Sequence, residues 1–238
     1  PQEGTFEFRK GPLFHNLILA DEINRAPAKV QSALLEAMEE RQISVGDKSY
    51  PLDDLFLVMA TQNPIEQEGT YPLPEAQLDR FLLHAQVGYP NAEQERSILV
   101  LNRDEAKANV RDAFQPPEQL SVASVMQARQ HILRLHLADE LEEYIVNIVL
   151  ATRNPGAVDA SLEGQVLYGA SPRASIGIDR AARARAWLAG RDFVGPEDIQ
   201  DVTADVLRHR LVLSFEAEAD GVDSNSVIER ILDGVGVP

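Results

Sequence analysis

The sequence predicts an α/β protein whose first part contains a parallel β-sheet and whose second part is all helical. Up to about residue 88, short apolar runs typical of strands alternate with segments that have helical periodicity. After Pro90, strand-like runs nearly disappear. Alternation of strands and helices favours a parallel sheet with crossover helices. We therefore expect two domains, which cover residues 1–88 and 89–238.

The first part is predicted to contain three strands. Residues 13–20 (LFHNLILA) form an apolar run of the kind found in a strand that is buried on both faces. Apolar side chains at positions 30, 33, 34, 37 and 38 then share one face of a helix. The remaining expected elements are a hairpin over 42–52, a second buried strand over 55–60, a short helix over 75–81 and a third strand over 82–87.

The second part shows helix-start signals and helical periodicity. Asn91 with Gln94 forms a plausible capping box, and Ser171-Pro172 is a typical helix start. The expected helices begin at Asn91, cover 121–135 and 139–153, run from Ser171 to about Leu188, and begin again at Gly195-Pro196.

Acidic side chains dominate the composition, with 38 Asp and Glu against 22 Lys and Arg and a net charge of −16. This balance opposes nonspecific binding to nucleic acid or to an anionic membrane, because both need clustered cations. The absence of cysteine excludes disulfides and thiolate metal sites. No apolar run approaches the roughly 18 residues of a membrane span, and the start PQEGTFEF does not resemble a secretion signal. We expect a cytoplasmic protein.

Two adjacent carboxylates, Asp21 and Glu22, follow the apolar run LILA. If this run is a parallel strand, the pair lies at the carboxyl end of the strand, where α/β sheets bind ligands. One carboxylate can hold Mg²⁺ there, usually through water, and the other can orient and deprotonate an attacking water. An apolar run that ends in Asp-Glu is the Walker B pattern. The plainer alternative is an acid pair that begins a solvated loop.

Three further polar residues favour the nucleotide interpretation. Asn63 follows the second predicted strand, so its amide belongs at the same sheet edge and can hydrogen-bond a phosphate and a water, although Asn-Pro is also a common turn. Arg80 lies before the third predicted strand, where it also suits a surface ion pair. Arg173 occupies the first turn of a predicted helix, a position that is unfavourable for a cation unless an anion approaches it.

Taken in order, the segments DEINRA, ATQNP, YPLPEAQLDRF, GYP and SPRAS resemble the MoxR family of AAA+ ATPases across nearly the whole chain. The resemblance implies part of an AAA+ P-loop NTPase core, followed by a helical lid domain. It implies ATP and Mg²⁺ as ligands, with Asp21 holding the metal and Glu22 activating water. It also implies sensor 1 at Asn63, the arginine finger at Arg80 and sensor 2 at Arg173.

In this family the finger acts on ATP held by the neighbouring subunit, so the resemblance implies a homo-oligomeric ring, typically a hexamer. The implied work is chaperone-like remodelling or activation of client proteins, such as metal-cofactor enzymes or proteins with a von Willebrand A-type domain. Residues 5–14 and the predicted hairpin at 42–52 are expected to face the ring surface or pore, where clients bind.

The sequence contains no phosphate loop of the form GxxxxGK[ST], whose backbone N–H groups cradle phosphates. The nearest segment, GDKS at 46–49, lies in the predicted hairpin. We expect the chain to be a piece of a longer protein, because the later catalytic positions are intact and no Met begins it. A degenerate relative that does not hydrolyse ATP is the alternative. On the first interpretation, this polypeptide alone is inactive, whereas the full-length protein hydrolyses ATP.

Two other functions stay open. A related AAA+ motor, such as a magnesium-chelatase-like subunit or a DNA translocase, would carry the same motifs, although the acidic charge argues against DNA. A non-catalytic assembly scaffold on the same fold is the third possibility. An upstream phosphate loop that is absent or altered would favour the scaffold.

Overall fold

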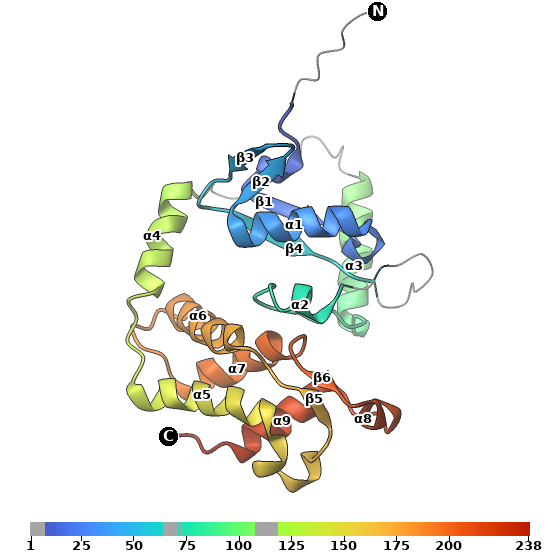
Figure 1. The fold of residues 1–238 in the computed structure, drawn as a ribbon. Coiled ribbons are helices and arrows are strands. Elements are labelled where there is room, and N and C mark those ends of the chain that lie inside the picture. The colour runs from blue at the N-terminus through green and yellow to red at the C-terminus, as the bar shows by residue number, and fades with distance from the viewer. Residues whose placement is uncertain (1–7, 64–70, 72, 108–118) are drawn as a thin grey trace, which may run out of the picture.

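Two parallel strands, β1 (Leu17–Ala20) and β4 (Leu57–Ala60), form the sheet of the first part. They pair in register along their whole length. Helix α1 (Ala28–Glu40) lies between them in the sequence and packs on one face of the pair (Figure 1). This arrangement belongs to a computed structural model that describes residues 8–63, 71, 73–107 and 119–238. The predicted parallel sheet with a crossover helix is thereby confirmed.

The described residues cover one face of this strand pair. Alternate residues of β1 and β4, such as Ile18 and Val58, pack against a cluster that includes Leu34 of α1. The opposite face carries apolar side chains that are between 55% and 67% exposed, namely Leu17, Leu19, Leu57 and Met59. The prediction of a strand buried on both faces is therefore wrong for this structure, since a helix layer lies on one side only.

The predicted hairpin is present as β2 (Gln42–Val45) and β3 (Lys48–Pro51), which pair antiparallel. Gly46 at its turn has a φ of 60°, a left-handed conformation that glycine adopts without a steric cost. Arg41, which ends α1, donates from Nη1 to the carbonyl of Phe56 at 2.7 Å. This contact ties the base of the hairpin to the segment that leads into β4.

Residues 82–87, predicted as a third strand, do not form one. They follow the short helix α2 (Glu75–Leu78), and their backbone bonds to the second part of the chain instead. The N–H of His84 donates to the carbonyl of Asp205 at 2.8 Å. The run is apolar enough for a strand, but no described strand lies beside it, so its backbone groups find partners in the helical part.

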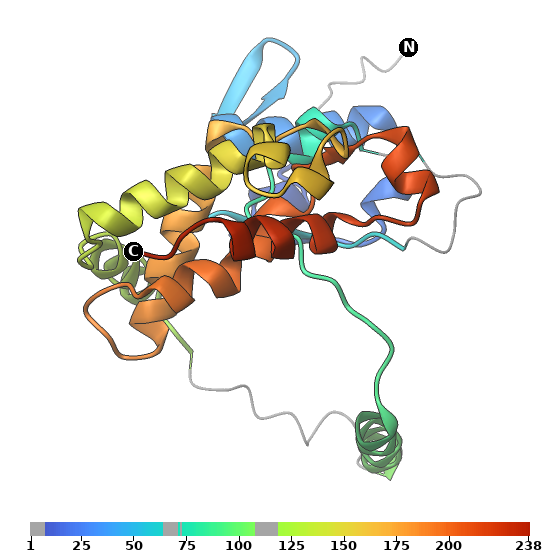
Figure 2. The same cartoon turned by 90° about the horizontal axis from the view of Figure 1, so that it is seen from below.

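Helix α3 (Ala92–Lys107) stands apart from the other helices (Figure 2). Its predicted capping box is present, because Asn91 Oδ1 accepts from the Gln94 N–H at 2.9 Å and the Asn91 N–H donates to Gln94 Oε1 at 2.9 Å. Every residue of α3 is exposed, including the apolar run 98–101. Its cap and intrinsic propensity, rather than packing, therefore support it in this structure.

The second part is helical, as predicted, with one short antiparallel pair formed by β5 (Val166–Tyr168) and β6 (Val212–Leu213). Among the described residues, no helix combines the length and apolar character needed to cross a membrane. Besides α3, the described helices of this part are α4 (Val122–Ile132), α5 (Asp139–Arg153), α6 (Pro172–Leu188), α7 (Pro196–Leu207), α8 (Phe215–Ala219) and α9 (Ser224–Gly234). Single 3₁₀ turns are η1 (Pro12–Phe14), η2 (Ile23–Arg25), η3 (Pro155–Ala157) and η4 (Ala160–Leu162).

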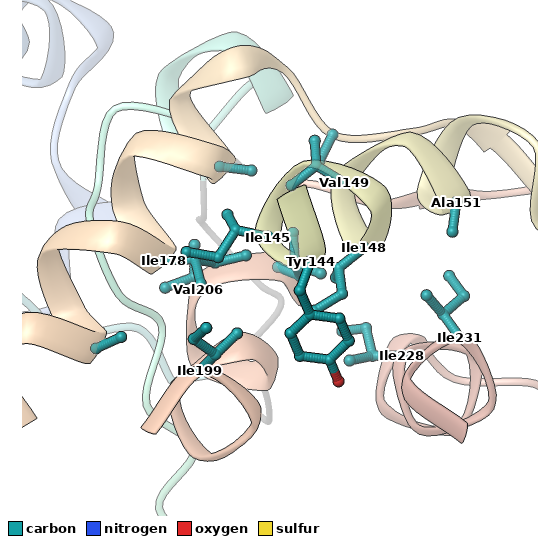
Figure 3. Close-up of a cluster of buried hydrophobic side chains, with 14 of the residues drawn as sticks. Tyr144, Ile145, Ile148, Val149, Ala151, Ile178, Ile199, Val206, Ile228 and Ile231 are labelled. Atoms are coloured by element: carbon teal, nitrogen blue, oxygen red, sulfur yellow. The ribbon is translucent and has the colours of Figure 1, made fainter. Parts of the chain in front are cut away.

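The larger hydrophobic core lies between α5, α6, α7 and α9 (Figure 3). The face of α5 that points inward repeats with helical spacing and includes Tyr144, Ile148 and Val149, all at most 2% exposed. On α6, Gly177 allows a close approach of α7, because a Cβ there would lie 3.0 Å from Val206 Cγ1. Close packing of this kind makes the second part sensitive to changes in side-chain volume.

Arg210 anchors the segment after α2 to this core. Its side chain is 3% exposed, and its Nε donates to Asp79 Oδ1 at 2.9 Å. Its Nη2 donates to the carbonyls of Asp79 and Phe81 at 3.0 and 2.6 Å. Burial lowers the pKa of Arg210, and Asp79 opposes this change by favouring the charged form. A buried guanidinium is costly without partners, so these contacts fix residues 79–81 in place.

His209 occupies the same junction in its neutral form. Its Nε2 lies 3.0 Å from the carbonyl of Phe81, which requires that Nε2 carry the proton. The buried Nδ1 has no hydrogen-bond partner among the described residues. Burial, and then the positive charge of Arg210, lowers the pKa of His209 to about 4. Protonation of Nδ1 would place a second cation beside Arg210 without an acceptor.

Ile148→Ala is expected to lower the free energy of unfolding by about 2–5 kcal/mol, because it leaves a cavity at a fully buried position of α5. Urea denaturation followed by circular dichroism measures this change. Leu150→Ala, at a position of the same helix that is 49% exposed, serves as the matched control and should change the free energy much less. Equal effects of the two substitutions would contradict the assigned core.

The free energy of unfolding should decrease as the pH falls from 6.5 to about 4. In this window the unfolded chain binds a proton on His209, whose ordinary pKa is 6.5, while the folded protein keeps it neutral. The 2.5-unit difference corresponds to roughly 3 kcal/mol. In His209→Gln this part of the pH dependence should disappear, and in the exposed control His131→Gln it should remain. An unchanged slope in His209→Gln would refute the assignment.

Candidate functional site

The acid pair lies at the carboxyl end of β1, beside the end of β4. Thr61, the residue after β4, connects the two strands here. Its hydroxyl donates to Asp21 Oδ1 at 2.6 Å and accepts from the backbone N–H of Glu22 at 2.8 Å. Its carbonyl accepts from the N–H of Ile23 at 3.0 Å. A hydroxyl that donates and accepts at once holds both acidic residues at this edge.

Glu22 has a left-handed backbone, with φ 49° and ψ 51°. This conformation costs a non-glycine residue about 1–3 kcal/mol and persists only when its surroundings enforce it. The hydrogen bonds of Thr61 to Glu22 and Ile23 supply that enforcement. The Glu22 carboxylate accepts from Arg25 Nη1 at 2.9 Å, and both side chains are at least 40% exposed. The backbone therefore directs this carboxylate toward solvent rather than into the core.

Asn63 lies two residues beyond Thr61 in the segment that follows β4. The parallel pairing of β1 with β4 brings it to the edge that carries Asp21 and Glu22, as expected from the sequence. Its assignment as sensor 1 stays a prediction. Sequence reasoning did not single out Thr61, although its position in ATQNP, directly after a strand, is a signal that could have found it.

The residues at this edge fit Mg²⁺. They offer the carboxylates of Asp21 and Glu22, the hydroxyl of Thr61 and the amide of Asn63, and Mg²⁺ prefers oxygen ligands. Among the described residues, no group of three or more His, Cys, Asp or Glu could enclose a metal. Mg²⁺ usually binds proteins through one or two carboxylates together with water and phosphate oxygens.

The two predicted arginines come together at a different place. Arg173, in the first turn of α6, donates from Nη2 to Glu39 Oε1 at 2.8 Å. Arg80, just after α2, forms an ion pair with the other oxygen of Glu39. The position of Arg173 near a helix N-terminus predicted a nearby anion. In this structure, that anion is a carboxylate of the same chain.

Asp79 links Arg173 to the buried junction. It accepts from Arg173 Nη1 at 3.2 Å and from the hydroxyl of Ser171 at 3.0 Å, in addition to Arg210. Burial raises the pKa of Asp79, but the hydrogen bonds from Ser171 and Arg173 and the charge of Arg210 outweigh it, so the pKa lies below its usual value. No local pattern in the sequence predicts this network, because its members lie up to 131 residues apart.

The acid pair precedes the first turn of α1, whereas Glu39, which binds Arg80 and Arg173, lies in its last turn. Parallel pairing of β1 with β4 requires the chain to return from one sheet edge to the other, and α1 makes that return. Glu39 lies eleven residues beyond Ala28, which corresponds to about 16 Å along the helix axis. The structure thus brings Arg80 and Arg173 together, but does not bring them to Asp21 and Glu22.

Comparison with known proteins identifies the family. A family profile described as "ATPase family associated with various cellular activities (AAA)" matches residues 1–83, and one described as "AAA lid domain" matches residues 160–231. The chain is 47% identical over 98% of its length to "Chaperone MoxR1" of Mycobacterium tuberculosis, of which it covers 60%. It is 42% identical over 98% of its length to "Uncharacterized protein YeaC" of Bacillus subtilis, of which it covers 69%.

The fold agrees with a solved structure as well. A crystal structure of a protein from Cytophaga hutchinsonii, described as a candidate ATPase, superposes with a TM-score of 0.91 at 47% identity. The match covers 99% of this chain and 70% of that one. The parallel strand pair followed by a helical lid agrees with these matches. The chain belongs to the MoxR family of AAA+ ATPases.

Proposed function

We propose that the full-length protein is an ATP-hydrolysing motor that remodels or activates client proteins. The observation that carries this proposal is the Thr61 contact, which holds Asp21 and Glu22 together at the carboxyl edge of two parallel strands. Ligands of α/β sheets bind at that edge. The family, with a relative named as a chaperone, supports the motor over the magnesium-chelatase-like, DNA-translocase and scaffold alternatives.

In this proposal, Asp21 holds Mg²⁺, through water, and Glu22 acts on the attacking water. The metal, when bound, neutralises phosphate charge. Glu22 orients the water and accepts its proton, a role that suits an exposed carboxylate with a fixed backbone. Asn63 hydrogen-bonds the γ-phosphate and the same water. Arg80 serves as the arginine finger and Arg173 as sensor 2, and each stabilises negative charge in the transition state.

We further propose that residues 1–88 form the C-terminal part of the ATPase core and residues 89–238 the lid. The phosphate loop is absent from this sequence, so this polypeptide alone should bind ATP weakly and should not hydrolyse it. The working form is a homo-oligomeric ring in the cytoplasm, a hexamer as the family resemblance implies. Its clients include proteins with a von Willebrand A-type domain, a class that rests on the family resemblance.

Glu22→Gln should lower the kcat of ATP hydrolysis by about 10²–10⁴-fold in the full-length protein, because the amide cannot accept the proton of the water. Steady-state phosphate release measures this change. Turnover equal to wild type in Glu22→Gln would remove the proposed role of the acid pair.

Arg80→Ala should lower kcat by about 10³–10⁵-fold in the same assay, because it removes a cation that stabilises transferring phosphate. Arg180→Ala, at an exposed position of α6, is the control and should keep full turnover. A loss of the same size in both variants would show a general effect of removing arginine and would contradict the finger.

A further inference from the structure

We propose that Glu39 is a positioning residue that holds Arg80 and Arg173 together as one paired group for the triphosphate of a second copy of this chain. This inference rests on the proposed ATPase function and extends it to a residue that neither the sequence motifs nor the family comparison singled out. Glu39 would not touch the nucleotide. It would act through the two guanidinium groups that it binds.

Glu39 contacts both arginines at once. The two oxygens of Glu39 are divided between the two arginines, Oε1 to Arg173 and Oε2 to Arg80. These arginines come from elements far apart in the chain, the end of α2 and the start of α6. Two like charges repel at such proximity, and a carboxylate between them offsets that repulsion. Without Glu39, the pair loses the group that sets its spacing.

The charges around Glu39 do not cancel. The linked ion pairs contain the carboxylates of Glu39 and Asp79 and three guanidinium groups, those of Arg80, Arg173 and Arg210. This leaves one excess positive charge in a chain whose net charge is −16. The buried partner Arg210 is committed to Asp79 and to backbone carbonyls. The excess therefore lies with Arg80 and Arg173, whose side chains are 32% and 48% exposed. An anion arriving from outside can reach both.

Arg80 and Arg173 lie far from the acid pair of their own chain. The pair lies at the end of α1 opposite to the acid pair, with about 16 Å of helix between Ala28 and Glu39. One γ-phosphate cannot contact Glu22 and this arginine pair of the same chain at once. The site of Asp21 and Glu22 is then incomplete within one chain. A neighbouring copy that presents its own arginine pair completes it.

Glu39→Gln in the full-length protein tests this inference. The amide keeps the size of the side chain but removes its charge. Arg80 then loses its ion pair with Glu39, and Arg173 keeps its ion pair with Asp79, so the distance between the two guanidinium groups is no longer fixed. We expect kcat for ATP hydrolysis to fall about tenfold, because small misplacements of transition-state groups are costly. We expect KM for ATP to change less than twofold, since the effect falls on transition-state rather than ground-state contacts.

Glu40→Gln is the matched control. Glu40 is the next residue of α1 and is exposed, and no described residue forms a hydrogen bond or an ion pair with its side chain. It should leave kcat and KM unchanged. In an Arg173→Ala background, Glu39→Gln should lower kcat by a smaller factor than in wild type, because one of the two guanidinium groups that Glu39 positions is already absent. Melting temperatures of Glu39→Gln and wild type should agree.

The possible outcomes separate the two proposals. If wild type hydrolyses ATP, Glu22→Gln does not, and Glu39→Gln behaves like Glu40→Gln, the role of Glu39 is overturned while the motor stands. If Glu39→Gln lowers kcat by the same factor in the wild-type and Arg173→Ala backgrounds, the role of Glu39 is also overturned, because Glu39 then does not act through Arg173. If full-length wild type does not hydrolyse ATP, both proposals fall together.

Discussion

The parallel pairing of β1 with β4 determines where the charged residues of this chain lie. Both strands end at one edge, so Asp21 and Thr61 are in contact although 40 residues separate them. The connection between parallel strands must return to the starting edge, and α1 makes that return. Its first turn therefore follows the acid pair and its last turn carries Glu39 to the other edge. A single helix thereby separates the acids from the arginines.

At that second edge, the geometry depends on a desolvated arginine. Arg210 is almost fully buried, and its planar guanidinium bonds the Asp79 carboxylate and several carbonyls at once, which a lysine could not do. Asp79 in turn orients Ser171 and Arg173 at the start of α6. A buried ion pair is weak evidence for stability, but it is well suited to fixing orientation. The packed core of the second part thus orients the exposed Arg173.

The failed predictions share one cause. Residues 82–87 have the apolar pattern of a strand, and residues 13–20 have the pattern of a strand covered on both sides. Both patterns predict burial against neighbouring strands or helices, and the described residues contain no such neighbours at these places. The run at 82–87 bonds to the helical part, and Leu17 and Leu19 remain exposed, like the apolar stretch of α3. The apolar pattern of a segment shows which side chains can be buried, whereas the elements that pack beside the segment determine which side chains are buried.

The sequence by itself determined the parallel strand pair, the hairpin, the helical second part and the caps, because period, turn residues and capping signals act over a few neighbouring positions. It also placed Asp21, Glu22 and Asn63 at one sheet edge, because parallel strands have a common direction. Only the tertiary structure decided that Thr61 joins the acids and that Glu39 joins Arg80 to Arg173. Those contacts depend on distant elements meeting in space, and no local pattern of residues encodes such a meeting.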